Sequence, residues 1–219
     1  MEIELNNENY LEYIKKYGFE QFCEILSSNP YITSLYLYSN NIGEKGAEYI
    51  AEALKLCKLE NSSSHLTTLY LNGNNIGDKG AKYIAESLKF NKFLTHLNLN
   101  GNNIGEKGAE YIAESLKINK FLTNLNLNDN NIGEKGAEYI AESLKVNKFL
   151  TTLYLGGNNI GDKGTEYIAE SLKVNKINRE KIKNERVEEK IYFTVLLQVP
   201  PVTKHWQSEF LEVFDKFYY

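Results

Sequence analysis

The chain has 219 residues, of which 29 are acidic and 25 are basic, and its formal net charge is -4. Acidic and basic residues alternate along it, and arginine occurs only at Arg179 and Arg186. A nucleic-acid-binding surface needs clustered positive charge, so this composition argues against nucleic acid as a partner. The two cysteines, Cys23 and Cys57, are too few for a disulfide framework, and reduced thiols fit them best.

Residues 1–31 precede the regular part of the chain. They begin with acidic and polar residues and lack the basic and apolar regions of a secretory signal. The apolar residues between Phe19 and Leu26 predict a short helix that ends near Pro30, so we expect an N-terminal helical cap.

No apolar stretch of the sequence approaches the roughly 20 residues that span a bilayer, so we expect no membrane span. A cytoplasmic protein is the resulting prediction. Delivery into a host cell would then use a secretion route that the sequence does not encode.

A block of 28 residues is written four times in succession from Leu66 to Ile177, and an imperfect copy from Ile32 precedes it. The copies Leu94–Phe121 and Leu122–Phe149 differ at three of 28 positions, so each unit must pack against a near-identical neighbour. The sequence therefore predicts a linear stack with one continuous core. The expected repeats are 32–65, 66–93, 94–121, 122–149 and 150–177, the first with a longer return loop at its end.

Each repeat begins with the pattern L-x-x-L-x-L, as in Leu66, Leu69 and Leu71, which predicts a short strand. The ninth position holds an asparagine, whose amide can bond the backbone groups left unpaired where the strand ends. A stripe that starts at Ala81 and Ile84 then predicts an amphipathic helix. The ninth-position asparagines are Asn40, Asn74, Asn102, Asn130 and Asn158.

The end of each predicted helix carries a second recurring pattern. The helices have an acid in the first turn and a lysine in the last, which matches the helix dipole. We expect the asparagine at position 26 to end each helix and the phenylalanine at position 28 to turn back into the core. These residues are Asn91, Asn119, Asn147 and Asn175, with Phe93, Phe121 and Phe149. A tyrosine column on the helices, which we interpret as packing between them, comprises Tyr49, Tyr83, Tyr111, Tyr139 and Tyr167.

The pattern L-x-x-L-x-L-x-x-N-x-L resembles the leucine-rich repeat family, and a 28-residue unit with a full helix resembles its ribonuclease-inhibitor-like subclass. The resemblance covers residues 32–177. It implies an α/β solenoid, a horseshoe arc with parallel strands on the concave face and α-helices on the convex face. Spacing requires the same curvature, because strands lie about 4.8 Å apart while helices are about 10–12 Å wide.

Residues 178–219 are expected to form a C-terminal helical cap with an aromatic terminal segment. The predicted helix over Asn178–Gln198 would cover the last repeat and end before Pro200. Its apolar residues at helical spacing are Ile182, Val187, Ile191 and Val195. The segment Trp206–Tyr219 either folds back as part of this cap or docks on a partner or a second copy.

Positions 3, 5, 7 and 8 of the repeat hold 8 of the 15 differences between neighbouring regular copies and are predicted to face the concave side. They are almost uncharged and rich in tyrosine and asparagine, a composition typical of contact surfaces. Neutral drift is the alternative explanation, although exposed helical residues such as Lys79 and Glu86 do not vary among the regular copies. The candidate partner-binding residues are Tyr36, Tyr38, Tyr70, Asn72, His96, Asn98, Asn100, Asn124, Asn126, Asn128, Asp129 and Tyr154.

No motif in the sequence predicts catalysis or a cofactor. The loop Gly73–Gly80 lacks the residue order that wraps a phosphate, and Cys57 with His65 is a weak candidate for a nucleophile and base. The three histidines stand in different segments without further ligands at metal-binding spacing. We therefore expect no catalytic residue, no metal and no cofactor.

Three functional hypotheses follow. The first is a non-enzymatic protein-protein interaction module that binds a protein partner, with a bacterial effector acting on a host protein as one form of it. The second is a regulator of a small GTPase, which the resemblance implies because Ran GTPase-activating proteins share this repeat subclass. The third is a structural protein that self-associates through its aromatic C-terminal segment.

Overall fold

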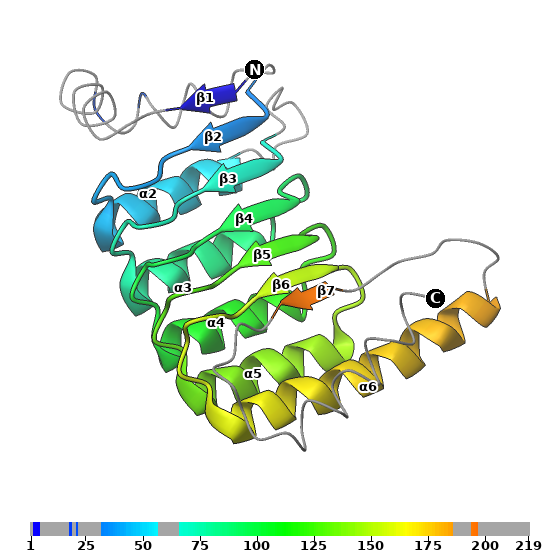
Figure 1. Cartoon of the computed structure of the whole chain (residues 1–219). Helices are drawn as coiled ribbons and strands as arrows, with labels where there is room; N and C mark the ends of the chain where they lie inside the picture. Colours follow the sequence, from blue (N-terminus) through cyan, green and yellow to red (C-terminus); the bar gives the residue numbers. More distant parts are fainter. Residues whose placement is uncertain are drawn as a thin grey trace.

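The structure, a computed structural model, describes residues 32–56 and 66–185, the short segments 2–4 and 194–196, and the single residues Gly18 and Gln21. Strands and helices alternate along these residues (Figure 1). The strands are β1 (Glu2–Glu4), β2 (Ser34–Tyr36), β3 (Thr68–Tyr70), β4 (His96–Asn98), β5 (Asn124–Asn126), β6 (Thr152–Tyr154) and β7 (Thr194–Leu196). The helices are α2 (Gly43–Leu56), α3 (Gly77–Leu88), α4 (Glu106–Leu116), α5 (Gly133–Val146) and α6 (Gly161–Glu185).

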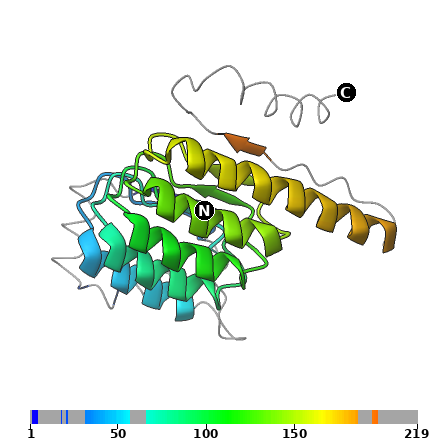
Figure 2. The same cartoon turned by 90° about the horizontal axis from the view of Figure 1, so that it is seen from below.

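The strands form one parallel sheet in chain order, and the helices stack in the same order on its other side (Figures 1 and 2). Each helix packs against the helix of the next repeat, from α2 to α6. Because helices are wider than the spacing between strands, the sheet lies on the concave face and the helices on the convex face. The predicted α/β leucine-rich repeat solenoid is confirmed.

The core lies between these two layers. The central leucine of each repeat strand is at most 2 % exposed, and the alanines and isoleucines of the predicted helical stripe point at it from the other side. A three-residue strand with its middle side chain inward must turn the two flanking side chains outward. This alternation produces the concave columns described below. The central leucines are Leu35, Leu69, Leu97, Leu125 and Leu153.

Four of the five ninth-position asparagines, Asn74, Asn102, Asn130 and Asn158, join neighbouring repeats, as predicted. The Asn102 side-chain oxygen accepts the backbone N–H groups of Asn74 and Ile76 at 3.0 and 3.3 Å. Its Nδ2 donates to the carbonyl oxygens of Leu71 and Leu99 at 2.8 and 3.0 Å. Asn74, Asn130 and Asn158 make equivalent bonds, so the backbone groups at each strand end are satisfied inside the core.

The tyrosine column on the helices is structural over most of its length. Tyr83, Tyr111, Tyr139 and Tyr167 pack against the core, whereas Tyr49 at the first repeat is 37 % exposed. Lys82 of α3 reaches over the ring of Tyr111 on α4, 5.6 Å from its centroid, and so links two helices. Lys107 lies over the same ring, and its hydrogen bond to Glu110 raises the pKa of its ammonium group.

One helix of the stack begins differently from the others. The Asp78 carboxylate of the second repeat accepts the backbone N–H groups of Gly105 and Gly108 at 2.8 and 2.7 Å, and so caps α4 of the third repeat. The glycines that open α2, α3, α5 and α6 have positive φ angles of 63–65°, but Gly105 does not. Asp78, which we predicted to interact with the dipole of its own helix α3, therefore also caps the next helix, α4.

We expect Asp78→Ala to lower the free energy of unfolding by about 1–2 kcal/mol, because α4 loses its side-chain cap. Chemical denaturation followed by circular dichroism would measure this change. Asp162→Ala is the matched control, since Asp162 is exposed in α6, the last of the described helices, and should change stability by less than about 0.5 kcal/mol. Equal effects of the two substitutions would contradict the capping role.

Each flank of the array adds a strand that the sequence analysis did not predict. Glu2–Glu4 forms β1, which pairs with β2, and Thr194–Leu196 forms β7, which pairs with β6. The helix predicted over Asn178–Gln198 is therefore wrong at residues 194–196, which form a strand. The physical reason is that β2 and β6 would otherwise leave a row of unpaired backbone groups at each end of the sheet.

The helix α6 also runs through Asn175, which we expected to end it. In the earlier repeats, the asparagine oxygen at position 26 accepts two backbone N–H groups as the chain turns into the next strand. No sixth repeat follows Asn175 in the sequence, so this turn is not required. Its Nδ2 still donates to the carbonyl oxygens of Leu144 and Asn147, a role that a continuing helix permits.

The prediction that the phenylalanines at position 28 enter the core is also wrong for Phe121 and Phe149. Phe121 and Phe149 are exposed, whereas the neighbouring Asn119 and Asn147 are buried. Asn119 donates from Nδ2 to the carbonyl oxygen of Leu88 at 2.7 Å and accepts from the backbone N–H of Leu122 at 2.8 Å. A helix end needs such a donor for its free carbonyl groups, and the asparagine takes the inward place that we assigned to phenylalanine.

Several predicted segments lie outside the described residues. These are the helix near Phe19–Leu26, the return loop between Cys57 and His65, and the aromatic segment Trp206–Tyr219. The boundaries of the two caps therefore stay predictions. Among the described helices, none combines the length and apolar character needed to cross a membrane.

Candidate protein-binding surface

The parallel register of the sheet arranges the candidate residues in columns. His96 stands beside Thr68 and Asn124, and Asn98 stands beside Tyr70 and Asn126. The outer repeat strands continue these columns, with Ser34 and Tyr36 in β2 and with Thr152 and Tyr154 in β6. Residues that are about 28 positions apart in the sequence thus become neighbours on one face.

All twelve candidate residues are at least partly accessible, as the alternation of the strands requires. Tyr38, His96 and Asp129 are exposed, and the other nine are half-buried. Within the third-position column, only Ser34 at the end of the array is buried. The twelve residues are therefore available to a partner, and we call them the concave surface.

Tyrosines gather at the first two repeats of the concave surface. The rings of Tyr36 and Tyr70 stack with their centroids 4.9 Å apart and an interplanar angle of 19°. Tyr38 lies two residues after Tyr36, in the turn that follows β2, and is exposed. Stacked rings lose little conformational freedom on binding, so this end offers a preformed apolar contact area with polar tips.

Amide groups occupy the centre of the concave surface, and their orientation is fixed. The side-chain oxygen of Asn98 accepts the backbone N–H of Asn100 at 3.0 Å, and that of Asn126 accepts the backbone N–H of Asn128 at 2.9 Å. Among the described residues, the Nδ2 groups of Asn98 and Asn126 have no protein partner. The centre therefore presents amide donors to a ligand, which suits a partner rich in carbonyl or carboxylate oxygens.

Asp129 supplies the single negative charge of this surface. Its carboxylate accepts a hydrogen bond from Nδ2 of Asn100 at 2.7 Å, across two neighbouring repeats. The backbone of Asp129 has a positive φ of 50°, a position where two neighbouring repeats hold Gly101 and Gly157. Asp129 is thus an exposed acid at a turn that the equivalent glycines make without a side chain.

His96 lies on the same face, with its Nδ1 2.8 Å from the hydroxyl oxygen of Thr95. Among the described residues, no group of three histidine, cysteine, aspartate or glutamate side chains is arranged to hold a metal ion. Cys57 and His65, the weak catalytic candidates, lie outside the described residues.

Residues 28–51, 62–85, 90–113, 119–141 and 146–169 match the leucine-rich repeat family, and together they make up more than half of the chain. The chain belongs to the leucine-rich repeat family. Its 28-residue unit with a full helix fits the ribonuclease-inhibitor-like subclass. No curated protein sequence matches this leucine-rich repeat chain.

Two solved structures share the fold of this leucine-rich repeat chain. The first is leiomodin-1 actin-binding site 2, with 26% sequence identity and a TM-score of 0.59 over 77% of this chain and 96% of that one. The second is the tropomodulin C-terminal domain of Caenorhabditis elegans, with 13% identity and a TM-score of 0.58 over 77% of this chain and 99% of that one. The second likeness shows the fold alone. The family match and the likeness to the leiomodin-1 domain support a protein-interaction module.

Sequence reasoning missed one surface of this leucine-rich repeat array, at the loops that lead from each helix to the next strand. Five apolar side chains there are 40–54 % exposed. A signal was present, because the motif K-x-N-K-F recurs three times and alternates lysine with apolar residues around one asparagine. We assigned the phenylalanines at position 28 to the core because we did not consider the asparagine as the inward residue, and we made no assignment for the apolar residues at position 25.

Proposed function

We propose that this chain is a non-enzymatic protein-interaction module that binds a protein partner on its concave surface. The observation that carries the proposal is a continuous, nearly uncharged face of tyrosine and asparagine on a stack whose strand ends are all hydrogen-bonded. Such a face matches the composition of interface cores, where aromatic residues are enriched and lysine and glutamate are depleted. A rigid array also loses little conformational entropy when it binds.

The chemistry of the concave surface indicates the kind of partner. Tyr36, Tyr38 and Tyr70 favour apolar or aromatic side chains, and the Nδ2 groups of Asn98 and Asn126 favour backbone carbonyl or carboxylate oxygens. Actin is the first partner to test, because a structural neighbour with 26% identity over 77% of this chain is named as an actin-binding site.

The first experiment removes the aromatic anchors. We expect Tyr36→Ala/Tyr70→Ala/Tyr154→Ala to weaken partner binding at least about tenfold, because truncating an aromatic hot spot costs about 2 kcal/mol or more. Co-sedimentation with filamentous actin and a parallel affinity pull-down would measure it. Tyr49→Ala is the control, since Tyr49 is an accessible tyrosine on the convex face.

The two assays of the first experiment separate two forms of the proposal. Absence of actin binding by the unaltered chain would remove actin as the partner. Equal recovery of every bound protein by the unaltered chain and the triple variant would refute the concave surface as the binding site.

The second experiment tests the amide donors with nearly isosteric changes. In Asn98→Asp/Asn126→Asp, the side-chain oxygens that hold the backbone N–H groups of Asn100 and Asn128 remain, but the donors are lost. We expect affinity for the partner identified above to fall about 10- to 100-fold, since a buried acceptor of that partner loses its bond. Asn103→Asp/Asn131→Asp adds the same charge at two exposed positions outside the concave surface and should leave affinity unchanged. A double variant that binds normally would show that these amides do not contact the partner.

A further inference from the structure

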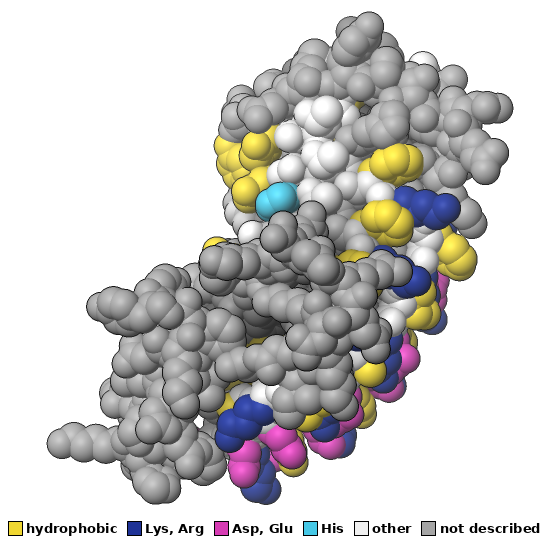
Figure 3. Space-filling model, turned by 90° about the vertical axis from the view of Figure 1, so that its right-hand side faces the viewer, with side chains coloured by type: hydrophobic (Ala, Val, Ile, Leu, Met, Phe, Trp, Pro, Cys, Tyr) yellow, Lys and Arg dark blue, Asp and Glu magenta, His cyan; other side chains and the backbone are white. Residues whose placement is uncertain are grey.

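The loops between helices and strands expose apolar side chains along one edge of the solenoid. Phe90, Ile118 and Val146 occupy position 25 and are 50, 54 and 54 % exposed, respectively. Phe121 and Phe149, at position 28, are 40 and 42 % exposed. With the half-buried Phe93, these residues form what we call the apolar rim. Figure 3 faces this edge and shows hydrophobic and lysine side chains side by side along it.

The asparagines at position 26 hold the apolar rim in place. Asn147 donates from Nδ2 to the carbonyl oxygens of Leu116 and Asn119 at 2.7 and 3.2 Å, and its oxygen accepts the backbone N–H of Phe149 at 2.8 Å. Asn119 does the same one repeat earlier. With each asparagine fixed inward, the apolar residues on either side of it are fixed outward. Exposed patches of this kind mark interaction sites.

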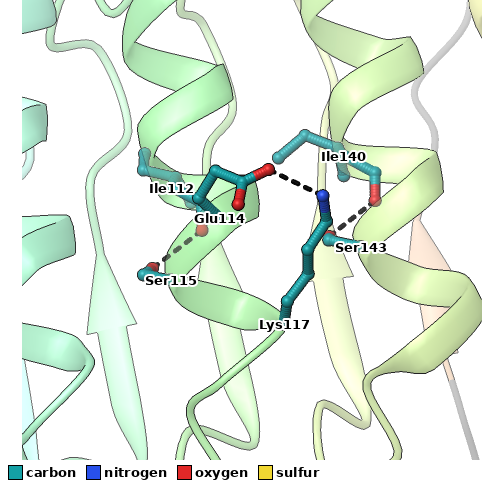
Figure 4. Close-up of polar contacts among 6 residues, drawn as sticks. All are labelled: Ile112, Glu114, Ser115, Lys117, Ile140 and Ser143. Carbon is teal, nitrogen blue, oxygen red and sulfur yellow. Dashed lines mark hydrogen bonds and ion pairs between the residues drawn. The ribbon is translucent and has the colours of Figure 1, made fainter.

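Basic residues accompany the apolar rim, and acidic residues are absent from it. Lys92, Lys120 and Lys148 lie between the apolar positions, are exposed, and form no ion pair with any described residue. By contrast, Lys117 one turn away pairs with Glu114 at 2.6 Å (Figure 4). No acidic residue occurs in the stretches 87–96, 115–124 and 143–152. The rim is therefore apolar and positive in a chain whose net charge is -4.

One segment of the same chain has the complementary chemistry. Trp206–Tyr219 lies outside the described residues, and its sequence carries aromatic residues at helical spacing together with three acids and one lysine. The aromatic residues at this spacing are Trp206, Phe210, Phe214 and Phe217, and the acids are Glu209, Glu212 and Asp215. An apolar, negative segment is what an apolar, positive rim would bind.

The chain is long enough to bring this segment to the rim. β7 pairs with β6 in parallel, so Thr194 stands beside Thr152, three residues after Phe149 of the rim. β7 then runs away from the rim for three residues, a distance of about 10 Å. The nine residues 197–205 that follow can extend over roughly 30 Å, about twice the roughly 17 Å from the end of β7 back to Phe149. Attachment to the same chain also raises the effective concentration of the segment at the rim.

We propose that Trp206–Tyr219 docks on the apolar rim of its own chain, with its aromatic residues against Phe121 and Phe149 and its acids near Lys120 and Lys148. This docking buries apolar surface on both sides and brings the unpaired lysines close to carboxylates. It is independent of the concave surface and of the function proposed for it.

Trp206 is the single tryptophan of the chain, so its fluorescence reports directly on this docking. In the full-length chain we expect Phe121→Ser/Phe149→Ser to shift the Trp206 emission to the red, toward that of an exposed indole. Collisional quenching by acrylamide should increase about twofold as the ring leaves its apolar contact. Tyr49→Ser, an accessible aromatic on the convex face, is the matched control and should change neither measurement. Far-ultraviolet circular dichroism would confirm that all variants remain folded.

Charge reversal provides a second variant that leaves the apolar contacts in place. Lys120→Glu/Lys148→Glu should also shift the emission to the red, and added salt should have the same effect on the unaltered chain. If emission stays constant in both rim variants, or if Trp206 is fully exposed in the unaltered chain, the proposal is wrong. Emission that depends on protein concentration, with a dimer in sedimentation, would instead assign the segment to a second copy and overturn docking within one chain.

Discussion

Asn102→Ala is expected to lower the free energy of unfolding by about 3–6 kcal/mol. The substitution removes the acceptor for the buried N–H groups of Asn74 and Ile76 and the donor for the carbonyl oxygens of Leu71 and Leu99. The two N–H groups are left without an acceptor, at about 1–3 kcal/mol each. The carbonyl oxygens of Leu71 and Leu99 each lose one of two bonds, because Nδ2 of Asn74 and Nδ2 of Asn130 still donate to them. Because Asn102 joins the second and third repeats, the unfolding transition should also broaden or separate into two steps.

Denaturation followed by circular dichroism would measure both effects of Asn102→Ala. Asn103→Gly is the control, because Asn103 is the next residue, is exposed, and bonds only the side chain of Asn75 among the described residues. Its φ of 55° suits glycine, so a change of less than about 0.5 kcal/mol is expected. A similar loss of stability in both variants would show that the hydrogen bonds of the ninth-position asparagines do not stabilise the fold as proposed.

Asn119→Ala is expected to have a comparable effect, about 3–5 kcal/mol, from the opposite end of the helices. The side chain bonds two carbonyl oxygens, of Leu88 and Asn91, and two N–H groups, of Phe121 and Leu122. All four lose this partner, three of them at a buried site and the N–H of Phe121 at a part-buried one, and unsatisfied groups at a buried helix end are costly. Amide hydrogen exchange at Phe121 and Leu122 should accelerate more than at the strand residues of the same repeat.

The neighbouring Lys120 gives the comparison for Asn119→Ala. Lys120→Ala alters an exposed side chain without an ion pair among the described residues, and should change stability by less than about 0.5 kcal/mol. If Asn119→Ala were equally mild, water would have to satisfy these carbonyl groups. The contrast between Phe121 and Asn119 in this structure would then need another cause.

The strength of sequence reasoning here came from repetition. Leu69 and Leu97 mark the inward face of the strands, and the alternation of a strand leaves no other place for Tyr70 and Asn98 than the concave face. The ladder role of Asn102 was predicted for the same reason, since a chain that leaves a sheet at every repeat must satisfy its backbone there. Because strand alternation and the asparagine at the strand end recur in every repeat, the sequence of one repeat is enough to predict them.

The wrong predictions at the helix ends concern sites where two side chains could each occupy one inward position. Phe121 and Asn119 are both plausible core residues at a helix end, and hydrophobicity alone favours the phenylalanine. The structure places the asparagine inside, because the carbonyl groups at the end of the preceding helix require a donor that only the neighbouring repeat can supply. The sequence of a single repeat does not contain that neighbour.

The structure at the two ends of the array also depends on hydrogen bonds to a neighbouring element. Val195 fits a helical pattern, yet it pairs with Leu153, because the last repeat strand offers backbone groups to any segment that reaches it. The sequence by itself determined the repeat, its strand and helix, and the residues of the concave surface, since these depend on periodicity within the chain. Only the tertiary structure decided the outward rim, the cap of α4 by Asp78 and the added strands, since each depends on hydrogen bonds between elements far apart in the sequence.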